Sequence, residues 1–175
     1  SRIVQIASQP ANLITVGIDL PPSPNQPNVW LAYWDSGTNN VYTVPYDILL
    51  HQVHAPVVAA AGNVVNRLTL VAYNGTATVF LEIPNFYTPA PISSIRTDLI
   101  AKVSVTNLGV VSGFTTIQRG MGLASKAFYD QTNTNIYVLV TFGETNQPTY
   151  FLIDQNGNSV AKLAYSNGGG YATTQ

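Results

Sequence analysis

Short runs of alternating apolar and polar residues, separated by turn-forming residues, fill most of the sequence. The clearest run lies at residues 14–20, where every second position is apolar. Alternation with a period of two is the mark of a β-strand that has one apolar face. Further runs combine β-branched or aromatic residues with flanking turn signals, at residues 29–34, 40–44, 67–73, 76–83, 100–106, 136–142, 149–154 and 159–165. The pattern predicts about nine or ten strands.

Turn-forming residues between these runs predict antiparallel hairpins. Asn74-Gly75 joins two runs directly, and Asn-Gly is the strongest short hairpin signal because both residues tolerate positive φ. Asn156-Gly157 and residues 35–39 connect other runs in the same way. The strands are therefore expected to pair with their neighbours in the sequence.

Helix is scarce in this pattern. Residues 46–54 and 121–129 are long enough for a turn or two of helix, and neither stretch carries helix caps. The three glycines at 168–170 are expected to form a flexible tail. The predicted fold class is all-β: an antiparallel β-sandwich, immunoglobulin-like or jelly roll, with little helix.

A proline-rich segment divides the chain into three parts. Residues 21–27 contain four prolines, and such a segment is stiff and extended at about 3.1 Å per residue. It separates an N-terminal amphipathic strand region, residues 1–20, from a β-sandwich body at residues 29–175. Residues 21–28 then form the spacer between the two.

Two interpretations of residues 1–20 are open. In the first, residues 12–20 form the first strand of the chain's own sandwich, with the prolines in a long loop, because sequential strands usually stay within one domain. Alternatively, it leaves its own body and completes the sheet of a neighbouring copy, where backbone hydrogen bonds give affinity and side-chain pockets give specificity. A head-to-tail contact of the second kind propagates as a filament.

Charge is depleted along the chain. Only 9% of residues are charged and the net charge is −1, whereas a soluble domain carries about 25% charged residues. Uncharged polar residues replace them, since Thr, Asn, Ser and Gln together number 54. Without a basic run the chain is not expected to bind nucleic acid. Neutral polar side chains desolvate more cheaply than charged ones, which suits a surface buried against copies of itself.

Other features favour an extracellular protein without a membrane span. No stretch approaches 18 consecutive apolar residues, so no transmembrane segment is expected. The sequence starts with Ser1 rather than Met, as expected if a signal peptide has been removed. Cysteine is absent, which excludes thiol catalysis and thiolate metal sites but is compatible with secretion at this chain length.

One glycosylation sequon is present. Asn74-Gly75-Thr76 is the single Asn-x-Ser/Thr sequence among 16 asparagines. The same residues form a predicted hairpin tip, which is exposed and accessible to a glycosyltransferase. An N-glycan on Asn74 is therefore expected if the host glycosylates secreted proteins.

Two tryptophans occupy one predicted strand. Trp30 and Trp34 lie on the same face of residues 29–34. If exposed, they would form an aromatic platform on which sugar rings stack. If buried, they belong to the core or to a subunit interface, and burial is favoured because large aromatic side chains dominate core energetics.

Two histidines raise the question of a metal site. His51 and His54 are three positions apart and would share one face of a helical turn, where two imidazoles can hold one metal. Asp47 is the only carboxylate nearby. We therefore expect two polar residues on a connecting segment, and neither a metal nor another cofactor.

Catalytic motifs are missing from the sequence. The eight carboxylates stand singly, mostly at turns or strand ends, where hydrogen bonds to the local backbone explain them. Glu82 is different because it lies inside a predicted strand. No nucleophile elbow, P-loop or zinc-binding helix occurs. The protein is not expected to be an enzyme.

The N-terminal region resembles the donor strands of filament subunits. Apolar positions precede a Cys-free body rich in Thr and Asn, and they are Ile3, Val4, Ile6, Ile14, Val16, Ile18 and Leu20. This arrangement is similar to bacterial chaperone–usher pilins and to the similarly built surface threads of archaea. The resemblance implies a pilin-like sandwich in which these seven residues fill pockets of the next copy.

The function that this resemblance implies is structural. The protein would be a non-enzymatic subunit of an extracellular filament on the cell surface, a homopolymer assembled head-to-tail by donor-strand complementation, with a role in cell adhesion. One alternative is a single-jelly-roll capsid protein of a virion, because the strand number and chain length also suit that fold. A further alternative is a carbohydrate-binding lectin or adhesin domain that uses Trp30 and Trp34.

Overall fold

The computed structural model describes residues 13–19, 29–84, 86–87, 95–96, 98–120, 122–142, 149–164 and 171–174. Within these ranges the protein consists of β-strands and turns, without helix. None of the described segments is a helix that could span a membrane. The predicted all-β class is confirmed.

The strands form three larger antiparallel sheets, here numbered along the chain. Sheet 1 has the order β1-β2-β3-β4, from β1 (Leu13–Ile18), β2 (Val29–Asp35), β3 (Asn40–Tyr46) and β4 (Val57–Ala60). Sheet 2 has the order β10-β9-β6-β5, from β5 (Arg67–Tyr73), β6 (Thr76–Ile83), β9 (Asp98–Thr106) and β10 (Thr115–Gly120). Sheet 3 runs in chain order through β11 (Gly122–Asp130), β12 (Asn135–Phe142), β13 (Thr149–Asp154), β14 (Ser159–Ala164) and β15 (Tyr171–Thr174).

Each larger sheet is a meander, because neighbouring strands follow one another along the chain. In sheet 2 the neighbouring strands β6 and β9 are not consecutive. Between them the chain forms a separate two-stranded ribbon, β7 (Phe86–Tyr87) with β8 (Ile95–Arg96). The β5–β6 hairpin turns at Asn74 and Gly75, with φ of 48° and 72°. Positive φ at both residues is the geometry of the type I′ turn that the Asn-Gly pair predicts.

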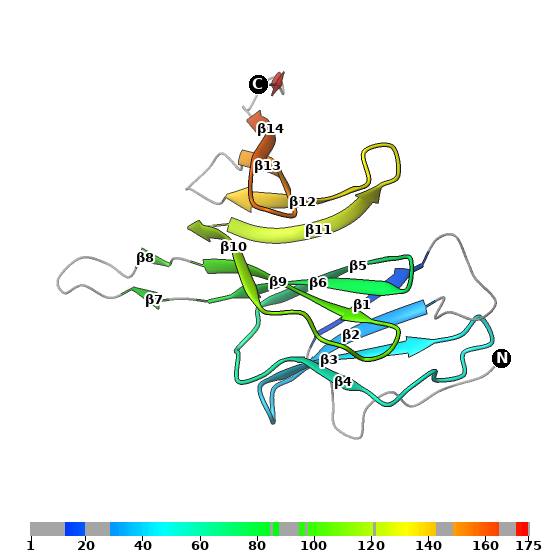
Figure 1. The fold of residues 1–175 in the computed structure, drawn as a ribbon. Coiled ribbons are helices and arrows are strands. Elements are labelled where there is room, and N and C mark those ends of the chain that lie inside the picture. Colours follow the sequence, from blue (N-terminus) through cyan, green and yellow to red (C-terminus); the bar gives the residue numbers. More distant parts are fainter. Residues whose placement is uncertain are drawn as a thin grey trace.

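Sheet 2 is the middle layer of the sandwich, with sheet 1 on one face and sheet 3 on the other (Figure 1). Strand β6 shows the reason most clearly. Its Val79 and Leu81 belong to the core shared with sheet 1, whereas Phe80 belongs to the core shared with sheet 3. A strand buried on both faces is a continuous apolar run rather than an alternating one, as residues 79–81 are.

All nine predicted runs are strands, but several strands were missed. The unpredicted ones are β4, β7, β8, β10, β11 and β15. The expectation of helix at residues 121–129 is wrong, because residues 122–130 form strand β11. Within β11, Ala127 is buried while Lys126 and Phe128 are exposed, which is alternation with a period of two.

The expectation of a helical turn at residues 46–54 is wrong as well. Tyr46 ends strand β3, and residues 47–54 form turns and a single bridge instead of helix. The glycines at 168–170 lie outside the described residues. The four residues that follow them, Tyr171–Thr174, form β15 and pair with β14.

Candidate functional site

Strand β1 is the edge strand of sheet 1 in its own chain. It pairs antiparallel with β2 from Leu13 opposite Trp34 to Ile18 opposite Val29. This is the arrangement in which the strand belongs to its own sandwich. Of the seven predicted donor residues, the structure describes Ile14, Val16 and Ile18; Ile3, Val4, Ile6 and Leu20 lie outside the described residues, as does the spacer at 21–28.

The apolar face of β1 points away from the core. Ile14, Val16 and Ile18 are 56%, 55% and 64% exposed. The opposite face carries Leu13, Thr15 and Gly17, and of these only Leu13 contributes a large side chain to the core. The predicted amphipathic pattern is therefore present, but its bulky side is turned outward.

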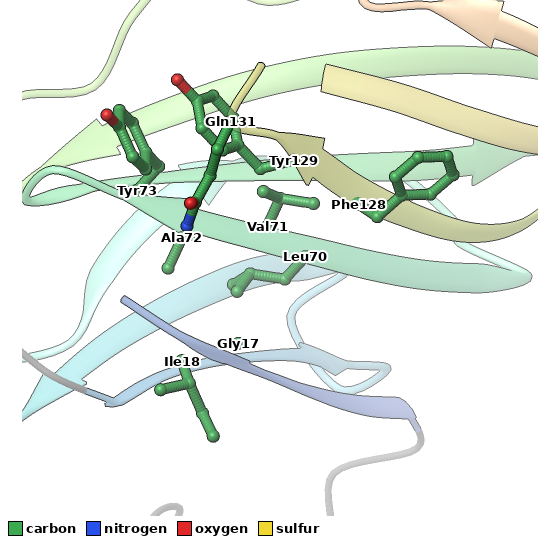
Figure 2. A pocket seen from close by; sticks show the side chains of 9 residues that line it. All are labelled: Gly17, Ile18, Leu70, Val71, Ala72, Tyr73, Phe128, Tyr129 and Gln131. Carbon is green, nitrogen blue, oxygen red and sulfur yellow. The ribbon is translucent and has the colours of Figure 1, made fainter. Parts of the chain in front are cut away.

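Gly17 lies directly over strand β5. A Cβ atom added at Gly17 would collide with Cδ2 of Leu70 and would lie 3.4 Å from the backbone nitrogen of Ala72. Figure 2 shows Leu70 beside Gly17. Both residues line a cavity of about 210 Å³, which Tyr73 and Phe128 also line. The glycine lets β1 approach β5 closely in this register, and the neighbouring cavity leaves space unfilled by the strand.

Asp19 fastens the end of β1 to sheet 2. Its side chain is only 2% exposed, and Oδ2 accepts a hydrogen bond of 2.6 Å from the backbone N–H of Gly75 in the β5–β6 turn. Burial raises the pKa of Asp19, although the N–H groups of Gly75 and Asn74 and the indole of Trp30 oppose the shift. Sequence reasoning did not single out this residue, whose partner is 56 positions away.

Replacing Asp19 by Asn is expected to keep or raise stability at neutral pH, because the amide oxygen still accepts from Gly75 without a buried charge. In the wild type the raised pKa means that the folded state binds the proton more tightly than the unfolded state. The free energy of unfolding should therefore rise as pH falls from neutral toward about 4, and Asp19→Asn should lose this contribution. Urea unfolding of both proteins across that range measures it.

Asp19→Ala is the matched control. It removes the charge and also leaves the buried N–H of Gly75 without its acceptor, which costs about 1–3 kcal/mol. If Asn and Ala destabilise the protein equally at neutral pH, the hydrogen bond to Gly75 does not fasten β1.

The outward side of β1 continues an apolar face across sheet 1. Val16 lies opposite Leu31, and Leu31 lies opposite Val44 of β3. Leu31, Tyr33, Val44 and Tyr46 form a buried cluster on this face, and Tyr33 stacks on Tyr42 with ring centroids 5.2 Å apart. The face is thus buried over β2 and β3 and exposed over β1.

Both tryptophans project toward the core rather than into solvent. Trp30 is 0% exposed and packs edge-on against the ring of His54 at 6.5 Å. Trp34 is half-buried, and its indole N–H donates a 3.0 Å hydrogen bond to the carbonyl oxygen of Asn63. Trp30 therefore presents no surface on which a sugar could stack in this structure.

The two histidines take part in separate interactions. His51 Nδ1 lies 3.0 Å from Asp47 Oδ2, and the backbone N–H of His51, which donates to the same carboxylate, lowers the pKa of Asp47. His54 Nδ1 donates to the carbonyl oxygen of Ala55 at 2.8 Å. Among the residues placed by the structure, no cluster of three or more His, Cys, Asp or Glu side chains could hold a metal ion.

Glu82 is fully buried in sheet 2 and is paired. Its Oε1 accepts from the Asn66 side chain at 3.4 Å, and its Oε2 lies 3.9 Å from Nε of Arg67. Asn66 also donates its backbone N–H to the carbonyl oxygen of Glu82. A buried carboxylate held by such partners ties the start of β5 to the end of β6, which is a structural arrangement.

Asn74 stands at the tip of the β5–β6 hairpin with its side chain exposed. The neighbouring Gly75 is engaged through its backbone, since its carbonyl accepts from Asn107 N–H at 2.7 Å and its N–H donates to Asp19. The turn is held firmly while the sequon asparagine faces outward, as attachment of a glycan requires.

Comparison of the chain with family models, with curated proteins and with solved structures finds no match. The features of this chain that bear on function are therefore the geometry of β1 and the surfaces around it.

Proposed function

We propose that the protein is a structural subunit of an extracellular filament, assembled when β1 of one copy completes sheet 1 of the next. The observation that supports this proposal is the orientation of β1, which leaves its bulky apolar face exposed on the surface of a single chain. An isolated chain leaves this apolar face in contact with water, whereas a polymer can bury it. Exposed contiguous apolar surface of this kind is characteristic of interaction sites.

The acceptor for a donated strand is the place that β1 fills in its own chain, here called the β1 seat. The seat consists of the edge of β2 together with the side chain of Leu70 and the backbone of Ala72 on β5. Exchange of an identical element between copies uses the site that the strand already occupies, so it needs no second binding surface. Residues 19–28, which join β1 to its antiparallel partner, are also far longer than a tight hairpin loop.

A shift of one residue in the exchanged strand would turn its apolar face inward, because side chains alternate between faces. The shift we propose places Val16 opposite Ala32, with Ile14 opposite Trp34 and Ile18 opposite Trp30. The opposite shift would move Ile18 beyond Val29, where β2 begins. The cavity beside Gly17 offers space for the larger side chains.

This change of register supplies the driving force for exchange. Ile14, Val16 and Ile18 are each more than half exposed in the chain's own sheet. Burying the remaining surface gives a gross gain of roughly 3–5 kcal/mol, before the loss of the Leu13 contacts, the loss of the Asp19–Gly75 hydrogen bond and the cost of association. The neutral, hydroxyl- and amide-rich surface of the subunit supports the same function, because it is cheap to desolvate between copies.

Negative-stain electron microscopy of the purified full chain tests the proposal directly. Fibres of uniform width are expected, with a subunit mass ladder in gels only after covalent cross-linking. Closed shells would instead identify a capsid protein, and monodisperse small particles at high concentration would contradict self-assembly altogether.

A further inference from the structure

Two tyrosines from different sheets stack beside the end of strand β5, independently of β1 exchange. Tyr73 ends β5 in sheet 2 and Tyr129 lies in β11 of sheet 3; their ring centroids are 3.8 Å apart and the rings are within 17° of parallel. Figure 2 shows the two rings side by side with their hydroxyls pointing the same way. Burial and the side-chain hydrogen bond with Tyr73 raise the pKa of Tyr129.

The tyrosine pair forms a wall of a cavity of about 320 Å³, here called the tyrosine groove. Its floor is apolar, from Val71 and Ile136, and its rim is polar, from Asn74, Thr76, Thr134 and Gln155. None of the nine lining residues is charged. The same two tyrosines also line the cavity beside Gly17, so the stacked pair lies between two hollows.

Several polar groups on this rim are available to a ligand. The hydroxyls of Thr76 and Thr134 and the side-chain amide of Asn74 have no hydrogen-bond partner within the described part of the chain, whereas Thr78 is paired with Ser104 at 2.9 Å. Gln155 donates its amide N–H to Asn135 at 3.0 Å, which leaves its carbonyl oxygen as an acceptor. Thr134 is held at a φ of 52°, a strained conformation for a β-branched residue.

We propose that the tyrosine groove binds a neutral sugar ring. Aromatic faces pack against the C–H face of a pyranose, and uncharged hydroxyls and amides hydrogen-bond its hydroxyl groups. A phosphorylated or acidic ligand would lack a cation in the lining, and a purely apolar ligand would leave the polar rim unpaired. The cavity volume lies at the lower end of the range for small-molecule sites.

The sugar can come from two sources: a glycan attached to Asn74 of the same chain, or an external glycan. Asn74 is the sequon asparagine and also part of the groove rim. A glycan attached to Asn74 would begin at the edge of the groove, so its first ring could pack on the tyrosines of the same chain. An external glycan would enter the groove of a chain that carries none.

The first experiment uses the full chain made without glycosylation and titrates methyl α-mannoside, methyl β-glucoside and N-acetylglucosamine, followed by NMR. At least one sugar is expected to bind with a dissociation constant on the order of millimolar and to shift the signals of groove residues. Tyr129→Ala should weaken binding at least 10-fold. Tyr42→Ala, which breaks the other stacked tyrosine pair on sheet 1, should leave it unchanged.

The second arm identifies the chain's own glycan as the occupant. In the glycosylated protein the groove should no longer bind added sugar, and removing the glycan enzymatically should restore binding. Thr134→Val, which keeps the shape of the side chain but loses the hydroxyl, should weaken binding in the unglycosylated chain. The proposal is overturned if no sugar shifts groove signals up to 50 mM, or if Tyr42→Ala reduces binding as much as Tyr129→Ala.

Discussion

A chain that lacks residues 1–20 is expected to form no polymers and to capture a synthetic peptide of those residues. Without β1 the edge of β2 and the Leu70 and Ala72 region of β5 are left open as an acceptor, but no strand remains to be donated. Size-exclusion chromatography with light scattering measures the polymers. Fluorescence anisotropy of a labelled peptide measures the capture.

Two variant peptides decide which face of the strand enters the seat. In the register seen within one chain, Val16 points outward and Gly17 points at Leu70. In the shifted register Val16 points inward instead, so Val16→Asp would bury an unpaired carboxylate and should reduce capture by at least about 100-fold. Gly17→Val should be tolerated. The reverse pattern would contradict the register shift, and polymers formed by the truncated chain would contradict strand exchange.

Gly157→Ala is expected to be the most destabilising single substitution discussed for the body. Gly157 lies in the β13–β14 turn at a φ of +88°, and an added Cβ would collide with the carbonyl oxygen of Ile117 on β10. The colliding atom is backbone, so it cannot move aside as a side chain can. Left-handed backbone and overpacking together should lower the free energy of unfolding by roughly 2–5 kcal/mol.

Gly62→Ala is the matched control for that substitution. Gly62 also has a positive φ, +70°, but nothing lies within 4 Å of an added Cβ. Gly62→Ala should therefore lower the free energy of unfolding only by the strain of a left-handed backbone, about 1–2 kcal/mol. Urea unfolding measures both variants. If the two variants lose equal free energy of unfolding, the β13–β14 turn is not in close contact with β10, and sheet 3 packs less closely on sheet 2.

Strand positions could be predicted from the sequence wherever local signals were strong. The β5–β6 hairpin followed from Asn74-Gly75, and the alternation at residues 14–18 correctly predicted that Ile14, Val16 and Ile18 share one face. Strand β11 was missed because small and polar residues at 122–127 hide its period. Short range patterns also cannot distinguish a meander from other sandwich connections, since strand order depends on pairings between distant segments.

The outward orientation of the apolar face of β1 and the two candidate sites could be found only from the structure. Which side of β1 points inward is set by Gly17 against Leu70, a contact between residues 53 positions apart in the sequence. Asp19 with Gly75, and Tyr73 with Tyr129, are each 56 positions apart. The two tryptophans were the aromatic residues singled out from the sequence, yet Trp30 is buried, whereas the stacked Tyr73 and Tyr129 line the groove.

Disulfide formation between two different chains tests the central claim most directly, because the protein has no cysteine of its own. One chain carries Val16→Cys and the other carries Ala32→Cys, and the two are mixed during assembly and then oxidised. Opposite residues of antiparallel strands are close enough for a disulfide. Strand exchange in the shifted register should give a covalent link between the two chains within the polymer.

A second mixture, in which Leu31→Cys replaces Ala32→Cys, tests for exchange in the unshifted register, since Leu31 is the partner of Val16 within one chain. A link between Val16→Cys and Leu31→Cys chains would keep strand exchange and refute the shift. The account is contradicted if neither mixture links two chains while a single chain with both Val16→Cys and Leu31→Cys closes its own disulfide, because β1 would then remain in its own sheet.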